Sequence, residues 1–285
     1  MTLDMSNIFL ILRAYSWPAS IVPVLIGSAV ARRHGTFSWT YFWLTLLAAL
    51  SVHSGANLAN TYFDFRNGVD KRESADDRGL VDGLISPSMA MRLALSLFAV
   101  SAAIGLWLSV TRPLPELTAV GLAGFMLAWF YTAGLVRYKY RALGDLGIFL
   151  AFGPLIVSGT ALIQAGRFLP EALTASLPAG LLIAAIVHAN NMRDSGPDRD
   201  SGVRTLAGSL GPERARLYYL SLLFAPYPIA WACGPLPGAL AALSLPSAIG
   251  LASLAARNEH AALVRRTAGF VAVFGGLFSA GILLR

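Results

Sequence analysis

The chain is 285 residues long, and 56% of them are hydrophobic while only 13% are charged. An ordinary soluble domain has about 25% charged residues, so this composition excludes a typical water-soluble enzyme. The net charge of +7 is compatible with nucleic-acid binding in principle, but the basic residues follow the pattern of membrane-protein loops instead. We therefore expect a membrane protein that contacts lipid and has no nucleic-acid partner.

Nine apolar runs follow one another along the chain, each about as long as a bilayer crossing. They cover residues 8–31, 38–60, 88–110, 114–134, 143–166, 170–191, 212–232, 236–256 and 263–284. The stretches between them are too short for a separate soluble domain. The sequence therefore predicts an all-α protein with one domain over residues 1–285. This domain would be a multi-pass transmembrane bundle of nine helices around a central cavity open to the cytoplasmic face.

The basic residues are divided unequally between the two ends of these runs. Sixteen of the 22 lysines and arginines lie in or beside the loops that follow the second, fourth, sixth and eighth runs. The opposite side has only Arg32, Arg33, Arg112, Arg167 and Arg285. The positive-inside rule then puts the N-terminus in the cytoplasm, and we expect a bacterial inner membrane. The first run lacks the pattern of a cleaved signal peptide, so we expect it to be retained.

The second run ends in a cluster of amide and carboxylate side chains. Asn60, Asp64 and Asn67 are spaced i, i+4, i+7 and therefore share one side of a helix. Gly68 is expected to end that helix, after which Asp70 returns from the loop. Helix capping explains any one of these residues, but it is a poor explanation for several together at a membrane surface, where carboxylates are costly.

A second cluster of the same kind ends the sixth run. Asn190, Asp194 and Asp198 are spaced i, i+4, i+8, and Pro197 should disturb the helix near its end. Ten of the fifteen acidic residues fall in the loops after the second and sixth runs, where they are mixed with arginines. Both loops lie on the same predicted side of the membrane, so we expect the two clusters to face one another across the cavity.

Such a pair of clusters suits the binding of a diphosphate through metal ions. Mg²⁺ prefers oxygen ligands and commonly joins protein carboxylates to substrate phosphates. It would neutralise the charge that grows as diphosphate leaves. Departure from an allylic carbon leaves a carbocation, which aromatic faces stabilise. Tyr62 and Tyr131 are the candidates for that contact, and an aromatic belt at the membrane interface is the alternative reading.

Further motifs surround the two clusters. They are Arg13–Gly27, Phe130–Thr132, Tyr140–Asp145, Phe152–Pro154, Asn190–Asp194, Asp198-Arg199 and Gly202–Leu206. With these motifs nearly the whole chain resembles the UbiA superfamily of intramembrane aromatic prenyltransferases. It resembles the menaquinone branch most: the 1,4-dihydroxy-2-naphthoate polyprenyltransferases (MenA) and the related animal enzyme that makes menaquinone-4.

The resemblance implies Mg²⁺-dependent transfer of a polyprenyl group from its diphosphate to a naphthoate or naphthoquinol. It assigns catalysis and Mg²⁺ binding to Asn60, Asp64, Asp70, Asp194 and Asp198. It assigns diphosphate binding to Arg13, Arg78, Lys139, Arg141, Asn190, Asn191 and Arg193. Three of these basic residues also have an explanation that needs no function. Arg13 could be a snorkelling side chain near the end of an apolar run, and Lys139 and Arg141 could be cytoplasmic loop residues that follow the positive-inside rule.

At two positions the chain departs from the pattern of bacterial MenA proteins, so the identity of the aromatic acceptor stays open. Bacterial MenA proteins often have aspartate at the position of Thr61 and lysine at that of Val203, and the animal branch matches this chain better there. A 4-hydroxybenzoate or homogentisate type of ring is an alternative acceptor. A transporter or quinone-binding protein is the alternative from another class, but transport favours charges near the midplane. We expect His53 to form interhelical hydrogen bonds and His188 to be structural.

Overall fold

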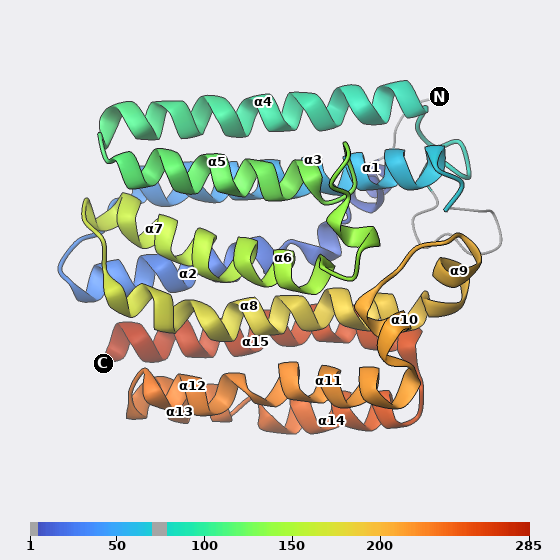
Figure 1. The fold of residues 1–285 in the computed structure, drawn as a ribbon. Helices are drawn as coiled ribbons and strands as arrows, with labels where there is room; N and C mark the ends of the chain where they lie inside the picture. The colour runs from blue at the N-terminus through green and yellow to red at the C-terminus, as the bar shows by residue number, and fades with distance from the viewer. Residues whose placement is uncertain (1–4, 70–78) are drawn as a thin grey trace.

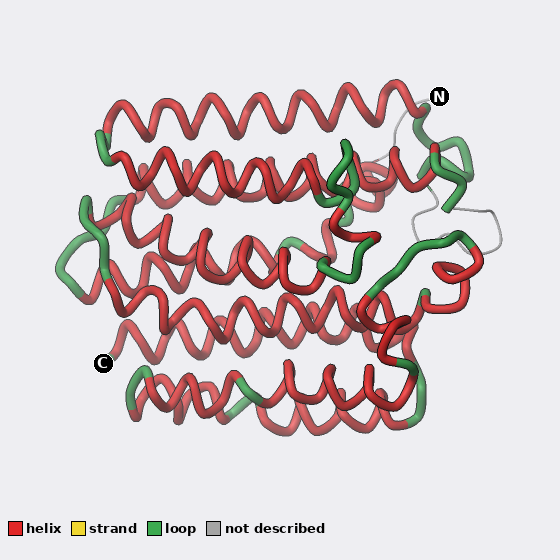
Figure 2. The backbone as a smooth tube through the Cα atoms, in the orientation of Figure 1, coloured by secondary structure: helices red, strands yellow, loops and turns green. Residues whose placement is uncertain are grey.

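The computed structural model describes residues 5–69 and 79–285, and within these ranges the protein is almost entirely helical (Figures 1 and 2). Neither range contains a β-strand, and the isolated bridge that occurs joins Arg141 to Arg204. The all-α prediction is confirmed. Asp70 and Arg78, two of the predicted site residues, lie outside the described residues.

Long helices run side by side along the bundle, and the connecting loops gather at its two ends (Figure 1). The elements are α1 (Met5–Ile11), η1 (Ala14–Ser16), α2 (Pro18–Arg33), α3 (Trp39–Arg66), α4 (Pro87–Thr111), α5 (Pro115–Phe130), η2 (Tyr138–Tyr140), α6 (Gly144–Leu150), η3 (Ala151–Leu155), α7 (Ile156–Ala165), α8 (Pro170–Arg193), α9 (Ser195–Asp200), α10 (Leu206–Leu210), α11 (Pro212–Phe224), α12 (Pro226–Ala232), α13 (Pro235–Ala242), α14 (Leu245–Ala256) and α15 (His260–Leu284).

Several helix starts follow from the local sequence. The hydroxyl oxygens of Ser38 and Ser86 accept hydrogen bonds from the backbone N–H groups of Tyr41 (3.5 Å) and Met89 (3.3 Å), which caps α3 and α4. Proline occupies the first turn of α4, α5 and α8, where its missing N–H costs no intrahelical hydrogen bond. Apolar runs bounded in this way become long helices.

Other expected spans are interrupted. The first breaks at Arg13, whose backbone is left-handed with φ 51°. The fifth contains the π-helix η3 around Pro154, and Pro226 separates α11 from α12. Six helical spans are long and apolar enough to cross a membrane, and α13 with α14, bent by 52°, would make a seventh. The predicted number of nine is therefore not confirmed for the described part of the chain.

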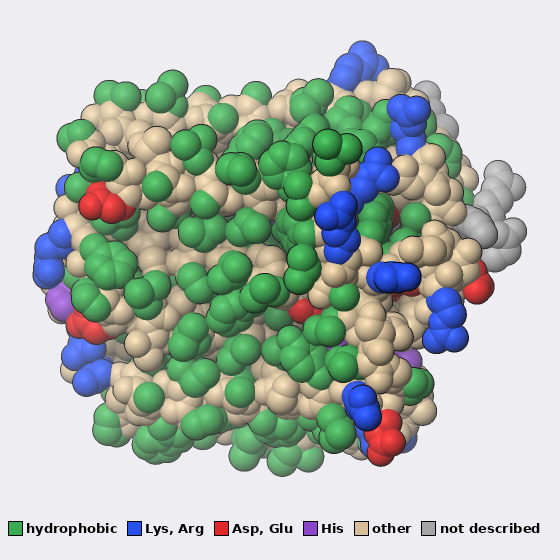
Figure 3. All heavy atoms as spheres, viewed as in Figure 1, with side chains coloured by type: hydrophobic (Ala, Val, Ile, Leu, Met, Phe, Trp, Pro, Cys, Tyr) green, Lys and Arg blue, Asp and Glu red, His purple; other side chains and the backbone are tan. Residues whose placement is uncertain are grey.

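The outside of the bundle is apolar and its ends are charged. Figure 3 shows hydrophobic side chains over the length of the helices and most charged ones at the two ends. Trp43, Leu106 and Leu122 are 58%, 68% and 62% exposed, an arrangement that suits lipid rather than water. Inside, Gly27 allows α2 to approach α7, because a Cβ there would lie 2.4 Å from the Val157 carbonyl oxygen. The protein is an integral membrane protein.

Candidate active site

The two acidic clusters lie at the same end of the bundle, on the right in Figure 1. Asp64 is in the last turn of α3, and Asp194 follows α8 directly. The short helix α9 then carries Asp198. The loop that contains η2 reaches the same end, so residues from three distant parts of the sequence come together there.

Asp64 is the centre of a buried hydrogen-bond network. The Lys139 ammonium nitrogen lies 2.6 Å from Asp64 Oδ2 and 3.0 Å from Asn60 Oδ1, and the Tyr140 hydroxyl donates to Asp64 Oδ1. Asp64 is 3% exposed. Burial alone would lower the pKa of Lys139, but the neighbouring Asp64 and Tyr140 raise it above its ordinary value. The lysine therefore stays charged and neutralises the first cluster.

The loop between α5 and α6 delivers Lys139 to this position. Arg137 and Ala142 have left-handed backbones, with φ 40° and 59°, and turn the chain on either side of η2. The Lys139 backbone N–H donates to the Tyr131 carbonyl at 3.0 Å. The Ala142 N–H donates to the Arg204 carbonyl at 2.8 Å, which ties this loop to the segment after the second cluster.

Arg193 holds the second cluster together. Its guanidinium group donates to both carboxylate oxygens of Asp194, at 2.7 and 2.8 Å, and to Asn190 Oδ1 at 2.8 Å. Asn190 Nδ2 in turn donates to Asp194 Oδ2 at 3.2 Å. Residues three and four apart on a helix are neighbours, so the sequence spacing explains this set. Asn190, Arg193 and Asp194, three of the predicted site residues, are thus hydrogen-bonded to one another.

Asp198 is buried, and the described residues do not hold its carboxylate in this way. It is 9% exposed, and no side chain in the described part of the chain donates a hydrogen bond to its carboxylate. Burial raises the pKa of Asp198 to about 6; the charge of Lys139 opposes this rise, and those of Asp194 and Asp64 add to it. The residues of both clusters therefore share one electrostatic environment.

Arg13 lies beside the first cluster. Its Nη2 is 3.3 Å from the hydroxyl oxygen of Thr61, and its charge acts on Lys139 and Tyr131. Because the first span breaks at Arg13, this arginine belongs to a turn near the acidic end and not to the middle of a continuous helix.

The two candidate aromatic residues have different surroundings. Tyr131 packs edge-on against Tyr138, with ring centroids 5.3 Å apart, and lies within electrostatic range of Asp64 and other acids of the site. The Tyr62 hydroxyl accepts a hydrogen bond from Arg66 Nη1 at 3.0 Å, and the same guanidinium group lies 5.8 Å from the Tyr62 ring centroid. Only Tyr131 is thus brought among residues of both clusters.

Arg141 and Asn191 contact groups outside the two acidic clusters. Arg141 is exposed, and its guanidinium group donates to the Leu135 carbonyl at 2.9 Å. Asn191 is 5% exposed, and its amide donates to Asp145 Oδ1 at 3.2 Å. Consecutive residues on a helix point about 100° apart. Asn190 therefore faces Asp194 from one side of α8, while Asn191 points from another side toward Asp145 on α6.

Tyr140 and Asp145 are absent from the predicted set of site residues. Asp145 is 2% exposed and lies 2.6 Å from His188 Nδ1, whose other ring nitrogen lies 3.0 Å from the Ala215 carbonyl. A carboxylate inside an apolar run is the feature that could have identified Asp145. No comparable feature points to Tyr140, because its partner Asp64 is 76 residues away.

His53 and His188 are internal hydrogen-bonding residues, as expected. His53 on α3 lies 2.9 Å from the Ser20 hydroxyl and 3.2 Å from that of Ser16. These contacts join α3 to α2 and η1. His188 is fully buried between α6, α8 and α11.

The donor chemistry of the site fits a hard cation. Among residues 5–69 and 79–285, no three or more His, Cys, Asp and Glu side chains are grouped closely enough to hold a metal ion. Asp64, Asp194 and Asp198 nevertheless offer only carboxylate oxygens, the ligands that Mg²⁺ prefers. Lys139 and Arg193 bind the first two, and no side chain among the described residues donates to Asp198. Such a set suits a cation that arrives together with an anionic ligand.

Comparisons with known proteins support the family that the sequence resembles. The model of the UbiA prenyltransferase family matches residues 20–278. UbiA prenyltransferase domain-containing protein 1 of Gallus gallus is 39% identical over 223 residues, which cover 77% of this chain and 66% of the relative. The human protein of that name is 39% identical over 221 residues, covering 76% and 65%. The chain thus spans about two thirds of these relatives. They are animal proteins, so they give no support to the expected bacterial inner membrane.

Solved structures share the fold. A UbiA homolog from Aeropyrum pernix K1 superposes with a TM-score of 0.73 at 19% identity, covering 94% of this chain and 97% of its own. A UbiA homolog from Archaeoglobus fulgidus, bound to GPP and Mg²⁺, has a TM-score of 0.64 at 16% identity, covering 98% and 100%. With the family match over residues 20–278, these findings show that the chain belongs to the UbiA prenyltransferase family.

Proposed function

We propose that this protein transfers a polyprenyl group from polyprenyl diphosphate to an aromatic naphthoate or naphthoquinol, as in menaquinone biosynthesis, and that the reaction requires Mg²⁺. The observation that carries the proposal is the buried Asp198 carboxylate, which has no donor in the described part of the chain and lies in the electrostatic environment of Asp64 and Lys139. A buried carboxylate without a hydrogen-bond donor is unfavourable, so its presence at a membrane surface favours a role with a cation. The Archaeoglobus homolog bound to GPP and Mg²⁺ supports this chemistry by analogy.

The residues of the two clusters have separate roles in this proposal. Asp64 and Asp198, with Asn60, Asp70 and Asp194, would hold Mg²⁺ and the diphosphate. Bound Mg²⁺ would supply Lewis-acid neutralisation of the departing diphosphate.

The basic groups would hold the diphosphate itself. Lys139 contributes a positive charge that is bound to Asp64 and also acts on Asp198, and we expect Arg193 and Arg13 to turn to phosphate oxygens. Tyr131 would present its aromatic face to the allylic cation.

The naphthoate acceptor rests on the resemblance to the menaquinone branch. The identity to animal UbiA proteins agrees with the match to the animal branch at Thr61 and Val203. We also propose that the acidic end faces the cytoplasm, because most basic residues lie in the loops at that end. Rings of the 4-hydroxybenzoate and homogentisate type are the competing acceptors.

The experiment is an incubation of purified protein with Mg²⁺, a polyprenyl diphosphate and each acceptor in turn, followed by mass spectrometry of the product. We expect a prenylated naphthoquinol from the wild type and none from Asp64→Asn. Asp200→Asn is the matched control, because Asp200 is an exposed acid on α9. If a prenylated product forms only from a ring of another type, that ring would take the place of the naphthoate or naphthoquinol as the proposed acceptor. Flux of substrate into proteoliposomes without diphosphate turnover would favour a transporter.

A further inference from the structure

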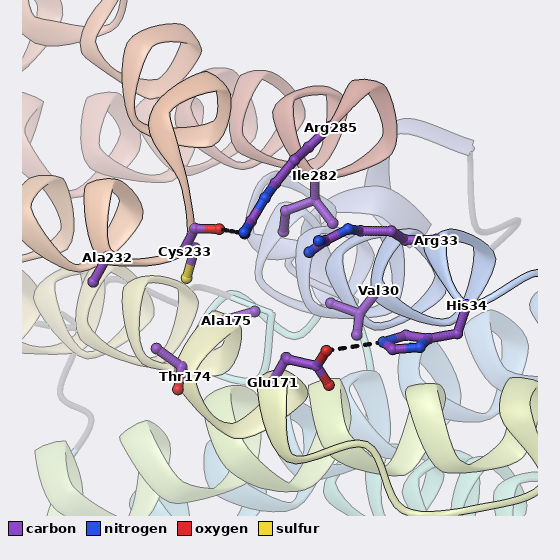
Figure 4. A pocket seen from close by; sticks show the side chains of 10 residues that line it. All are labelled: Val30, Arg33, His34, Glu171, Thr174, Ala175, Ala232, Cys233, Ile282 and Arg285. Atoms are coloured by element: carbon purple, nitrogen blue, oxygen red, sulfur yellow. Dashed lines mark hydrogen bonds and ion pairs between the residues drawn. The ribbon is translucent and has the colours of Figure 1, made fainter.

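A second polar site lies at the other end of the bundle. A cavity of about 260 Å³ occurs there between α2, α8, α12 and α15 (Figure 4). Its charged lining consists of Arg33, His34, Glu171 and Arg285. None of the residues of the proposed diphosphate site contributes to it.

The length of α8 separates this cavity from the acidic clusters. Glu171 lies in the first turn of α8 and lines the cavity, whereas Asp194 follows the last turn. At 1.5 Å per residue, the helix places these two residues about 35 Å apart. The hydrocarbon core of a bilayer is about 30 Å thick. The cavity therefore lies at the membrane face opposite to the clusters and cannot belong to the same site.

The side chains that line the cavity carry an excess of positive charge. The Glu171 carboxylate lies 3.0 Å from His34 Nε2 and is thereby engaged. Arg285 donates to the Cys233 backbone carbonyl, and within residues 5–69 and 79–285 neither Arg285 nor Arg33 forms an ion pair with a carboxylate. Both guanidinium groups extend toward the same space (Figure 4). Two like charges beside one glutamate favour the binding of an anion.

The remaining wall is apolar. Val30, Ala232 and Ile282 contribute aliphatic side chains. Burial raises the pKa of the Cys233 thiol, so this group stays protonated and is a poor nucleophile. A ligand for this cavity therefore needs an anionic head beside an apolar part.

The size limits the ligand further. Pockets for drug-sized molecules are commonly about 300–1,000 Å³, so a cavity of about 260 Å³ suits a head group better than a quinone or a prenyl chain. Arginine binds phosphate through two parallel N–H bonds, and basic pockets between membrane helices bind lipid head groups. We propose that the cavity binds the phosphate head group of an anionic phospholipid in the leaflet opposite to the acidic clusters.

The test is the binding of short-chain phosphatidylglycerol, phosphatidylcholine and inorganic phosphate to the purified full chain, measured by native mass spectrometry and thermal unfolding. Phosphatidylglycerol should bind with a defined stoichiometry and raise the melting temperature more than the other two. Arg33→Gln and Arg285→Gln should each weaken its binding about tenfold or more, since each removes a charge-assisted contact.

Arg32→Gln is the matched control. Arg32 neighbours Arg33 in sequence, but it lies 5.6 Å from the Phe37 ring centroid and does not line the cavity. The Arg32→Gln variant should bind phosphatidylglycerol as tightly as the wild type does. Arg33→Lys, which keeps the charge but loses the planar fork, should bind with intermediate affinity.

Three results would overturn the proposal. Equal binding of phosphatidylcholine would show that the phosphate charge is not recognised. Equal binding of inorganic phosphate would show a simple anion site without lipid selectivity. An equal loss in Arg32→Gln and Arg33→Gln would show a diffuse surface charge. If the glutamine variants do not fold, the competition among the three ligands on the wild type still decides the question.

Discussion

Replacement of Asp198 by asparagine should stabilise the protein at neutral pH while it abolishes the proposed reaction. The Asp198 carboxylate is 9% exposed and has no hydrogen-bond donor in the described part of the chain. Asp64 and Asp194 add negative charge nearby. Asparagine keeps the shape of the side chain and removes its charge, so the change relieves repulsion without opening a cavity.

The magnitude follows from the pKa. Burial raises the pKa of Asp198 to about 6, from an ordinary value near 4 in the unfolded chain. The folded state then binds this proton more tightly than the unfolded state. Stability therefore falls as the pH rises from about 4 to 6, and the full penalty is present above that window. Two pKa units correspond to about 3 kcal/mol, and screening at this partly wetted end reduces the expected gain to about 2 kcal/mol.

The assay is thermal unfolding of both proteins between pH 4 and 8 without divalent cations. The melting temperature of Asp198→Asn should exceed that of the wild type at pH 7.5, and the two should converge near pH 4. The exposed neighbour provides the control, since Asp200→Asn should show no such difference. A variant less stable than the wild type at pH 7.5, or a difference that is independent of pH, would refute this reasoning.

Three further outcomes test the site. Lys139→Met should lower the free energy of unfolding by about 3–5 kcal/mol, because Asp64 loses its buried partner. Arg141 is exposed, so Arg141→Met should change the free energy of unfolding by less than about 0.5 kcal/mol. Denaturant unfolding of the two variants measures the difference. Asp145→Leu should cost at least about 3 kcal/mol by leaving His188 without its partner, which thermal unfolding would detect. Chelation by EDTA should abolish release of diphosphate, and added Mg²⁺ should restore it; turnover unchanged in EDTA would contradict the metal requirement.

Much of the helical architecture could be predicted from apolar periodicity and helix-end residues. The helix α3 extends beyond the predicted run 38–60 to include Asp64, and Asp194 directly follows α8, so both clusters lie at helix ends as the pattern indicates. The interruptions were harder to predict. Pro154 inside an apolar run indicates a disturbed helix there, but no residue that favours a left-handed backbone marks the turn at Arg13.

The site required contacts that local sequence does not encode. Lys139 contacts Asp64, 75 residues away in the sequence, through a loop that is left-handed at Arg137 and Ala142. Neither arginine nor alanine favours a left-handed backbone, so the sequence does not indicate the course of this loop. Asn191 is a different case, since helical geometry alone separates it from Asn190 by about 100°. That information was present in the sequence. The single-domain prediction for residues 1–285 stays a prediction, although the family match covers residues 20–278.

The most direct test of the central claim is prenyl transfer measured on three proteins side by side, with Mg²⁺ and with EDTA. We predict that the wild type and Asp200→Asn form a prenylated naphthoquinol only with Mg²⁺, and that Asp198→Asn forms none while it remains folded at neutral pH. Product formation by Asp198→Asn at the rate of the wild type, or by the wild type in EDTA, would contradict the assignment of the two clusters to Mg²⁺ and diphosphate.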